Sequence, residues 1–268
     1  MRSDCHIHVR ADLDSKKVLA DMDRLGIDRV VLMGPGFRGT IEEQRSSDDA
    51  LAKICGTAPE RLLGFARIDP RIDGITDEIK RCKEELKLPG VKMLPDHWAP
   101  CDEFMFPVYE AIEAMGMPII FHSGILWGNA DSSRFCRPAL YESVVHFPKL
   151  TIALAHIGWP WTDECIAVVH RFVHRARREG RKNPQVFIDT TPGTPPIYRK
   201  DAFKKALACC GPGTMIYGSD LGLPRSDLAI TVERMANDER ILKELGCTEE
   251  EVEMVLGTNL DKLFEPPM

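Results

Sequence analysis

The chain has 268 residues, 44% of them hydrophobic, which is enough to bury the core of one large α/β domain. A net charge of -6 and a pI near 5.8 argue against nucleic acid or an anionic membrane as the main partner. No apolar run approaches the roughly 18 residues that a membrane-spanning helix needs, and no basic and apolar leader precedes the first predicted strand. We therefore expect a soluble, cytoplasmic protein. Its nine cysteines have no regular spacing and indicate reduced thiols, not a disulfide framework.

Short apolar runs alternate with longer segments of helical period along the whole chain. The predicted strands are 4–9, 29–33, 63–68, 90–94, 118–122, 151–156, 185–190 and 215–219. The predicted helices are 15–25, 42–55, 75–86, 104–115, 137–146, 162–179, 196–209 and 227–245. Strands about every 25 to 35 residues, with a helix in each gap, predict right-handed crossovers and a parallel sheet. Eight such units can close into a (β/α)8 TIM barrel, and we expect residues 1–268 to form this single α/β domain.

A doubly wound open sheet is the alternative fold. A dinucleotide-binding version of it needs a glycine-rich turn after an early strand, and Gly34, Gly36 and Gly39 do follow the second predicted strand. However, Pro35 removes a backbone donor from this turn, and the next predicted helix begins too late. We therefore favour the closed barrel.

The most informative motif is Asp4-Cys5-His6-Ile7-His8. On a β-strand Asp4, His6 and His8 share one face, while Cys5 and Ile7 pack behind them. Two neighbouring imidazoles can bind the same cation, and neutral nitrogens suit zinc, iron, nickel or manganese better than magnesium or calcium. Because an isolated His-x-His also occurs by chance, the prediction of a metal site depends on further ligands nearby.

Three later predicted strands also end in polar residues. His122 follows the fifth strand, His156 the sixth and Asp220 the eighth. In a parallel barrel the carboxyl ends of all strands meet on one face, where the catalytic residues of such barrels lie. Either histidine alone could be a satisfied core residue, but together with His6, His8 and Asp220 they predict a convergent site.

These motifs resemble the amidohydrolase superfamily. They are DCHIH at 4–8, FHSG at 121–124, AHIG at 155–158 and GSD at 218–220. They occur in the family order over nearly the whole chain. The similarity is greatest to the amidohydrolase-related branch, which contains aminocarboxymuconate-semialdehyde decarboxylase, resorcylate decarboxylase and pyrone-dicarboxylate lactonase.

The resemblance implies one divalent metal ion, which we expect to be Zn²⁺, with Mn²⁺ as the alternative. His6, His8, His122 and Asp220 would bind it, and a set of imidazoles plus a carboxylate with an open position suits a catalytic site. A water activated by the metal would be the nucleophile at neutral pH. Dinuclear relatives bridge two ions with a carboxylated lysine, and Lys92 lies near the matching position, but we favour a single ion.

The resemblance also implies the catalytic residues. Asp220 would orient the water or accept its proton, and His156 would polarise a substrate carbonyl or shuttle a proton. Substrate contacts are expected from loops after the strands, because arginine forks bind carboxylates bidentately and aromatic rings can wall a cyclic substrate. The candidates are Arg38, Arg67, Lys92, Arg134 and Trp159. Each has a structural alternative, such as a buried ion pair for Arg67 or ordinary loop packing for Trp159.

Two reactions remain open from the sequence. The leading prediction is a metal-dependent hydrolase that cleaves an ester, lactone or amide bond in a small carboxylated or cyclic substrate. The alternative is a nonoxidative decarboxylase of a small aromatic or unsaturated carboxylic acid, because both reactions use a Lewis acid beside a histidine and an aspartate. We expect a small-molecule substrate and no nucleic-acid or membrane partner. The basic run of the predicted helix 162–179 would suit an acidic neighbouring subunit, which is compatible with a homodimer.

Overall fold

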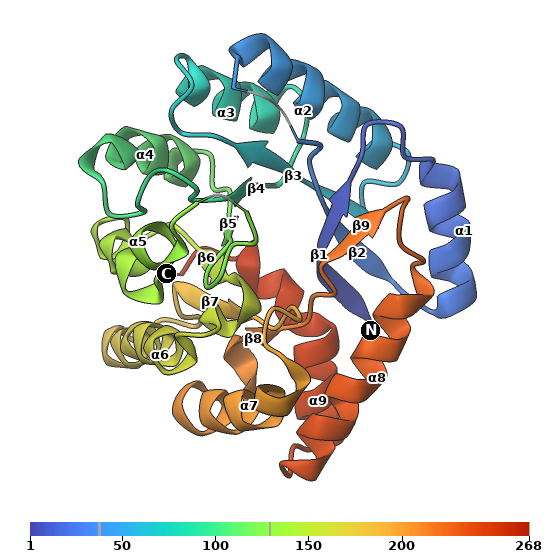
Figure 1. The fold of residues 1–268 in the computed structure, drawn as a ribbon, viewed down its shortest axis with the longest axis vertical. Helices are drawn as coiled ribbons and strands as arrows, with labels where there is room; N and C mark the ends of the chain where they lie inside the picture. Colours follow the sequence, from blue (N-terminus) through green and yellow to red (C-terminus); the bar gives the residue numbers. More distant parts are fainter. Residues whose placement is uncertain (37–38, 129, 268) are drawn as a thin grey trace.

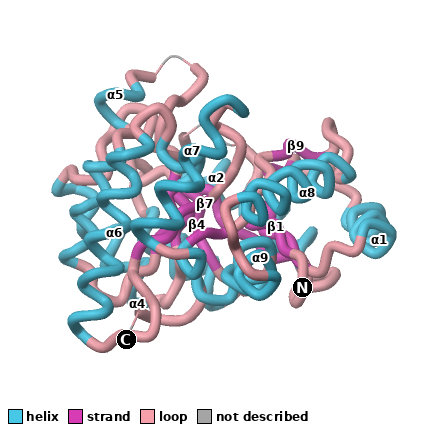
Figure 2. Tube along the Cα trace, turned by 90° about the horizontal axis from the view of Figure 1, so that it is seen from below, coloured by secondary structure: helices cyan, strands magenta, loops and turns pink. Residues whose placement is uncertain are grey.

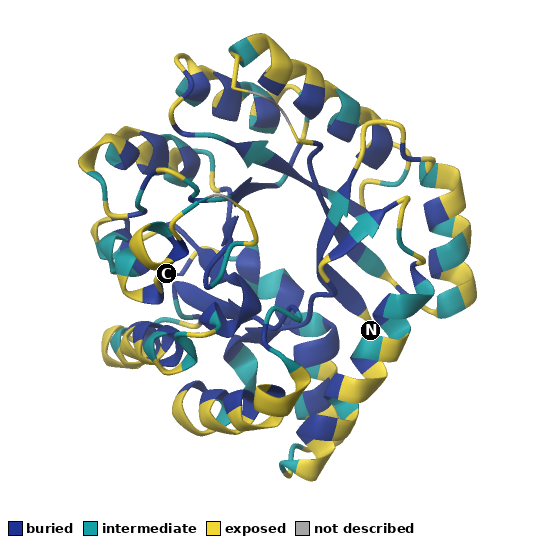
Figure 3. Ribbon diagram, in the orientation of Figure 1, coloured by how far each residue is buried: buried dark blue, intermediate teal, exposed yellow. Residues whose placement is uncertain are grey.

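The computed structural model describes residues 1–36, 39–128 and 130–267. Helices surround a central sheet of strands, and the helix faces turned toward the sheet are buried (Figures 1 and 3). The strands are β1 (Ser3–Val9), β2 (Arg29–Met33), β3 (Leu62–Ile68), β4 (Gly90–Met93), β5 (Ile119–Phe121), β6 (Ile152–Leu154), β7 (Val186–Asp189), β8 (Met215–Ile216) and β9 (Leu221–Leu223). The helices are α1 (Ser15–Leu25), α2 (Ile41–Cys55), α3 (Ile75–Glu84), α4 (Phe106–Ala114), α5 (Ser132–Phe135), α6 (Thr162–Glu179), α7 (Pro196–Cys210), α8 (Ala229–Glu244) and α9 (Glu249–Leu256).

The strands form one parallel sheet in the order β8-β7-β6-β5-β4-β3-β2-β1-β9. Because β8 and β9 follow each other in the chain, they are two parts of the eighth strand, and the sheet curls so that its ends meet beside β1. Two backbone hydrogen bonds join these ends, from Cys5 N to Tyr217 O at 2.9 Å and from Asp220 N to His6 O at 2.8 Å. The predicted (β/α)8 barrel is therefore confirmed, with helices outside the strands in a second view as well (Figure 2).

The eighth strand differs from its prediction. It was expected to run unbroken over 215–219, but β8 ends at Ile216 and β9 starts at Leu221. Between them Asp220 has a left-handed backbone with φ of 57°. Such a residue cannot continue an extended strand, so the chain turns here and carries the Asp220 side chain toward β1.

Strand β1 also departs from strict alternation. Its register against β2 shifts between Asp4 and Ile7. As a result Asp4 hydrogen-bonds Thr231 of α8, while Cys5 packs in a buried cluster with residues such as Phe65. The expectation that Asp4 shares a face with the two histidines is thus wrong, because the irregularity changes the side-chain parity that a regular strand would keep.

Local sequence signals define most helix ends. Asp14 accepts hydrogen bonds from Lys16 N and Lys17 N and so caps α1. Helix α9 was not predicted, although Thr248 and Glu251 form a capping box at its start. The predicted helix 137–146 is a 3-10 helix over Pro138–His146.

Within the described ranges, no helix combines the length and the apolar character needed to cross a membrane.

Candidate active site

Three polar side chains meet at the carboxyl ends of the first and eighth strands. His6 Nε2 lies 3.3 Å from His8 Nε2. Asp220 Oδ1 lies 3.4 Å from each of these nitrogens. Ligands about 2.1 Å from one tetrahedral zinc ion are separated by roughly 3.4 Å, so the three atoms have the spacing of one face of a coordination tetrahedron. We call His6, His8 and Asp220 the ligand triangle.

The backbone of β1 and of the turn at Asp220 positions the three side chains of the triangle. His6 and His8 extend from neighbouring same-side positions at the end of β1, and the left-handed turn brings Asp220 to them from the eighth strand. Burial acts to raise the pKa of Asp220, but the hydrogen bond from His8 and the nearby imidazoles hold that pKa well below its ordinary value. Burial lowers the pKa of His8 to about 4. An ionised carboxylate beside neutral imidazole is the state that binds a divalent cation.

A buried aspartate orients His6. Asp189, the last residue of β7, lies with Oδ2 2.6 Å from His6 Nδ1, and both side chains are almost fully buried. Asp189 also accepts a hydrogen bond from Thr191 N at 2.9 Å. If Nδ1 of His6 carries the proton, its Nε2 keeps a lone pair for the ligand triangle. Burial opposes ionisation of Asp189, yet the His6 ring outweighs this and lowers the pKa of Asp189.

Asp189 was missed in the sequence, although it lies within the predicted strand 185–190. An aspartate within an apolar strand was the available signal, because a buried carboxylate needs a partner. The partner could not be identified from sequence, since His6 lies 183 residues away.

His156 and His122 line the wall beside the triangle. The ring centroids of His156 and His122 are 4.9 Å apart, and that of His156 is 5.6 Å from His6. Nδ1 of His156 lies 2.9 Å from Thr191 Oγ1. Burial lowers the pKa of His156 to about 4 and that of His122 well below its ordinary value. Both imidazole rings are therefore neutral at pH 7.

His122 stands slightly apart from the triangle. Among the described residues, the group at this site whose ligand atoms all lie within 4.8 Å of one another is His6, His8 and Asp220. His122 instead has Nε2 3.2 Å from the carbonyl oxygen of Ile125. A donor Nε2–H in that bond would leave its Nδ1 as the nitrogen with a lone pair.

Lys92 extends from β4 to the same point. Its side chain is buried, and its Nζ lies 3.3 Å from His6 Nε2. Burial lowers the pKa of Lys92 to about 8. The ammonium is a compact cation at the edge of the triangle and can contact an anionic group bound there.

A cavity of about 490 Å³ opens above these groups, which is a typical size for a small-molecule site. Its polar lining consists of His8, Arg67, Lys92, His122, His156 and Asp220. Its less polar lining consists of Leu94, Ile125, Leu126, Trp127, Pro192, Gly193 and Pro195. The cavity thus combines charged and imidazole groups with apolar and aromatic side chains.

Two other residues predicted to contact the substrate, Arg134 and Trp159, do not line this cavity. Arg134 is exposed on α5, with its guanidinium 5.1 Å from the ring centroid of Phe135. Trp159 lines a different cavity of about 460 Å³, together with Trp161. Arg38 lies outside the described residues. Of these candidates, Arg67 and Lys92 are the ones that line the cavity above the triangle.

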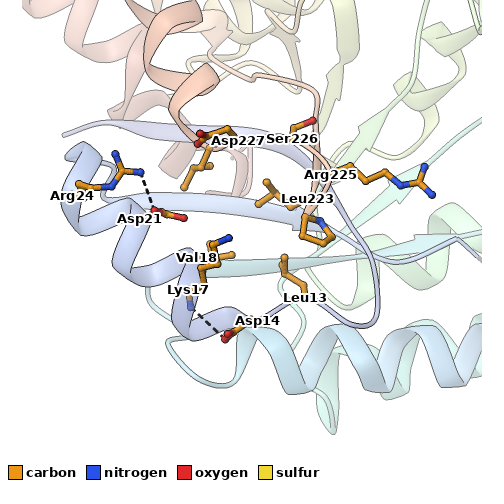
Figure 4. Close-up of a pocket in the computed structure, with 12 residues that line it drawn as sticks. Leu13, Asp14, Lys17, Val18, Asp21, Arg24, Leu223, Arg225, Ser226 and Asp227 are labelled. Carbon is orange, nitrogen blue, oxygen red and sulfur yellow. Dashed lines mark hydrogen bonds and ion pairs between the residues drawn. The ribbon is translucent and has the colours of Figure 1, made fainter.

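A further groove of about 340 Å³ lies between α1 and the segment that follows β9 (Figure 4). Its acidic side chains already serve the helix, because Asp14 caps the first turn and Asp21 pairs with Arg24 at 2.9 Å. Asp14 and Asp21 thus have their partners within α1. Three imidazoles and the Asp220 carboxylate line the cavity above the triangle instead.

Comparison with protein families decides the class of this chain. The family model described as amidohydrolase matches residues 3–265. The chain belongs to the amidohydrolase family. The resemblance predicted from the motifs is confirmed, and the protein is an amidohydrolase-family enzyme of the hydrolase or carboxy-lyase type. No curated protein matches the sequence.

Solved structures similar to this amidohydrolase cover almost its full length. The 2,6-dihydroxybenzoate decarboxylase from Rhizobium has a TM-score of 0.70 at 18% identity, with 98% of each chain covered. A 5-carboxyvanillate decarboxylase from Novosphingobium aromaticivorans, complexed with manganese and 4-hydroxy-3-methoxy-5-nitrobenzoic acid, has a TM-score of 0.69 at 17% identity, covering 99% of this chain and 96% of that one. A probable 2-pyrone-4,6-dicarboxylic acid hydrolase from Acinetobacter baumannii has a TM-score of 0.69 at 15% identity, with 98% of each chain covered. At these identities the likeness establishes the fold.

The amidohydrolase family is metal-dependent, and this chain has donors that suit a metal. Imidazole nitrogens with a carboxylate oxygen suit zinc and manganese alike. The ligand triangle has the spacing of a coordination face, and Asp189 gives His6 the outer hydrogen bond that metal-binding histidines usually have.

Proposed function

We propose that this amidohydrolase hydrolyses an ester, lactone or amide bond in a small carboxylated or cyclic substrate. The proposal rests on the ligand triangle at the charged end of the 490 Å³ cavity. His6, His8 and Asp220 would hold one divalent ion, Zn²⁺ or alternatively Mn²⁺, and His122 would complete the set. When bound, the ion supplies a Lewis acid that polarises a carbonyl and acidifies water.

Asp220 and His156 would move the protons. Asp220 is ionised and its side chain is 34% exposed, so one of its oxygens can orient a water and accept its proton. His156 has Nδ1 engaged by Thr191, which leaves Nε2 for the substrate. A neutral imidazole at that position can accept the proton and pass it to the leaving oxygen or nitrogen.

Lys92 and Arg67 favour an anionic substrate. Lys92 is buried beside the triangle, and Arg67 lines the same cavity from β3. The ammonium of Lys92 is hidden from water, so a substrate carboxylate that contacts it would stabilise its charge. Ile125 and Trp127 also line this cavity and offer apolar and aromatic surface to a ring. Outer contacts from Arg38, Arg134 and Trp159 remain predictions.

Nonoxidative decarboxylation is the second candidate. It is favoured by the full-length structural similarity to two decarboxylases, one of them complexed with manganese. In that reaction the carbon that loses CO2 must gain a proton. Lys92, a buried cation at the edge of the triangle, could supply it.

One assay separates the two reactions. The purified enzyme, loaded with Zn²⁺ or Mn²⁺, is offered carboxylated lactones, aryl esters and hydroxybenzoates, while acid release and CO2 release are followed in parallel. Hydrolysis predicts acid release without CO2, and this acid release should vanish in Asp220→Asn. Stoichiometric CO2 with an intact ester or ring would overturn the hydrolase proposal and support the decarboxylase. Neither product across the panel, from metal-loaded protein, would count against both.

Metal number, location and assembly are separate proposals. We propose one ion per chain, which elemental analysis checks, and two equivalents would contradict it. A cytoplasmic location and a homodimer are predictions that cell fractionation and light scattering test.

A further inference from the structure

Helix α8 carries a row of polar residues on the face that packs against the barrel. Thr231, Arg234 and Asp238 are spaced by three and four residues, so they lie on one side of the helix. Thr231 is 0% and Asp238 1% exposed. A helix that covers a barrel usually buries an apolar stripe there, because polar groups lose hydration on burial unless they are hydrogen-bonded. Each member of the row does have a partner.

The first member contacts β1 at Asp4, two residues before His6. Thr231 Oγ1 donates to Asp4 Oδ2 at 3.0 Å. The other oxygen of Asp4 accepts from His6 N and from Ser219 N, each at 3.0 Å. Thr231 thus fixes the Asp4 carboxylate, and this carboxylate in turn links the backbone of His6 to that of Ser219.

The second member contacts the end of the eighth strand. Arg234 donates from Nη1 to the carbonyl oxygen of Ser219, the residue before Asp220. On the same segment the hydroxyl of Tyr217 donates to Thr231 O at 2.7 Å. The chain on the N-terminal side of Asp220 is therefore bonded to α8 at two points.

The third member reaches the end of β7 through a buried arginine of α7. Arg199 Nε donates to Asp238 Oδ1 at 2.7 Å, and Arg199 Nη2 to Asp238 Oδ2 at 2.5 Å. The same Nη2 donates to Thr190 O at 2.6 Å. Arg199 is 6% exposed, so this bridge between two helices and a strand end is shielded from water.

Thr190 lies between the two residues that orient the site imidazoles. Asp189 binds His6 Nδ1, and Thr191 Oγ1 contacts Nδ1 of His156. A shift of Thr190 would displace both neighbours, because consecutive residues share the same short backbone. Arg199 therefore fixes the segment from which both rings take their orientation.

We propose that α8 is a positioning helix for the active site, in which Thr231, Arg234 and the Asp238–Arg199 pair set the β1, β8 and β7 ends relative to one another. This inference rests on the proposed function only in taking those ends as the metal site. A stabilising role alone explains the pair poorly, since replacing a buried ion pair by apolar residues of similar volume is often neutral or stabilising. The directed hydrogen bonds of the pair fix the position of Thr190, which apolar side chains in their place would not do.

The test replaces the pair as a unit. The double variant Arg199→Leu/Asp238→Leu removes both charges, so neither is left buried alone. Its control is Arg29→Leu/Asp261→Leu, which removes an ion pair of 2.6 Å between residues that do not line the cavity above the triangle. Thermal unfolding, metal affinity by chelator competition, and the ring N–H signals of His6 and His156 in NMR spectra of metal-free protein are compared.

We expect the α8 double variant to keep a melting temperature close to that of its control, to bind metal about tenfold more weakly, and to show displaced ring signals. Wild-type metal affinity and ring signals in a folded double variant would overturn the inference. If the double variant does not fold, Thr231→Val, which removes only the hydroxyl contact to Asp4, is tested with the same readouts and limits. If wild-type protein binds no metal, the proposed function fails, while the ring signals still decide the role of α8.

Discussion

Replacing Asp189 by Asn tests how the site prepares His6. The side chain keeps its shape, so no cavity forms, and the carbonyl oxygen of Asn can still accept from Thr191 N. What changes is the charge at 2.6 Å from His6 Nδ1. An amide can present an N–H to that nitrogen, which would place the proton of His6 on Nε2 and block the lone pair that the ligand triangle needs.

The expected magnitude follows from burial. The His6 and Asp189 side chains are 1% and 0% exposed, so water does not screen the interaction. A hydrogen bond to a charged partner contributes about 1.5 to 3 kcal/mol. Since about 1.4 kcal/mol corresponds to tenfold in a binding constant, metal affinity should fall by about 10- to 100-fold.

Chelator competition measures this affinity in wild type and in Asp189→Asn. The control is Asp48→Asn, which changes an equally buried aspartate of α2 that contacts Cys82 of α3. We expect the control to bind metal like wild type. Metal affinity of Asp189→Asn within about threefold of wild type, less than 1 kcal/mol, would refute the orientation of His6 by Asp189.

Further predictions concern two histidines and one buried carboxylate. His156→Ala should retain metal by elemental analysis and lower turnover about 10²-fold, and full activity would refute its role in proton transfer. His122→Ala should lower metal occupancy after dialysis, whereas unchanged occupancy would make His122 a substrate contact only. Burial, with the nearby Glu78, raises the pKa of Asp48 from 3.8 to about 7, so the folded state binds this proton more tightly than the unfolded chain. The contribution of Asp48 to stability therefore falls as pH rises from about 4 to about 7 and stays level above that. In urea unfolding, Asp48→Asn should gain stability relative to wild type as the pH rises from 4 to 8, and a constant difference would contradict this.

The fold was predictable because its signals are local. Helices α1 (Ser15–Leu25) and α6 (Thr162–Glu179) and strand β2 (Arg29–Met33) have the bounds predicted from apolar period and chain punctuation. Helix α9 was not predicted, although its capping box is also a local signal, since its 8 residues are too few for a clear apolar period. The break in the eighth strand depends on the backbone angle at Asp220, which no periodic pattern encodes.

The ligand triangle was predictable for the same reason that the barrel was. Once the strand ends share one face, the order of the motifs brings His6, His8 and Asp220 together. The residues that orient the imidazole rings were not predictable. The roles of Asp189 and Thr191 become visible only from their contacts with His6 and His156 in the folded protein. Hydrogen bonds between residues far apart in sequence depend on the packing of β7 beside β8 and on side-chain directions.

Backbone conformation links these unpredicted contacts to the chemistry. Asp220 and His156 have φ of 57° and 62°, a left-handed region that costs a non-glycine residue roughly 1 to 2 kcal/mol. In each case the backbone N–H donates a hydrogen bond that holds the turn, from Asp220 N to His6 O at 2.8 Å and from His156 N to Thr191 Oγ1 at 3.0 Å. A regular strand would continue past both positions, whereas the strained turns bring these side chains to the triangle and to its wall. The hydrogen bonds to His6 O and Thr191 Oγ1 therefore offset the cost of the two left-handed conformations. Since these conformations position Asp220 and His156, we expect substitutions around them to alter metal binding more than folding.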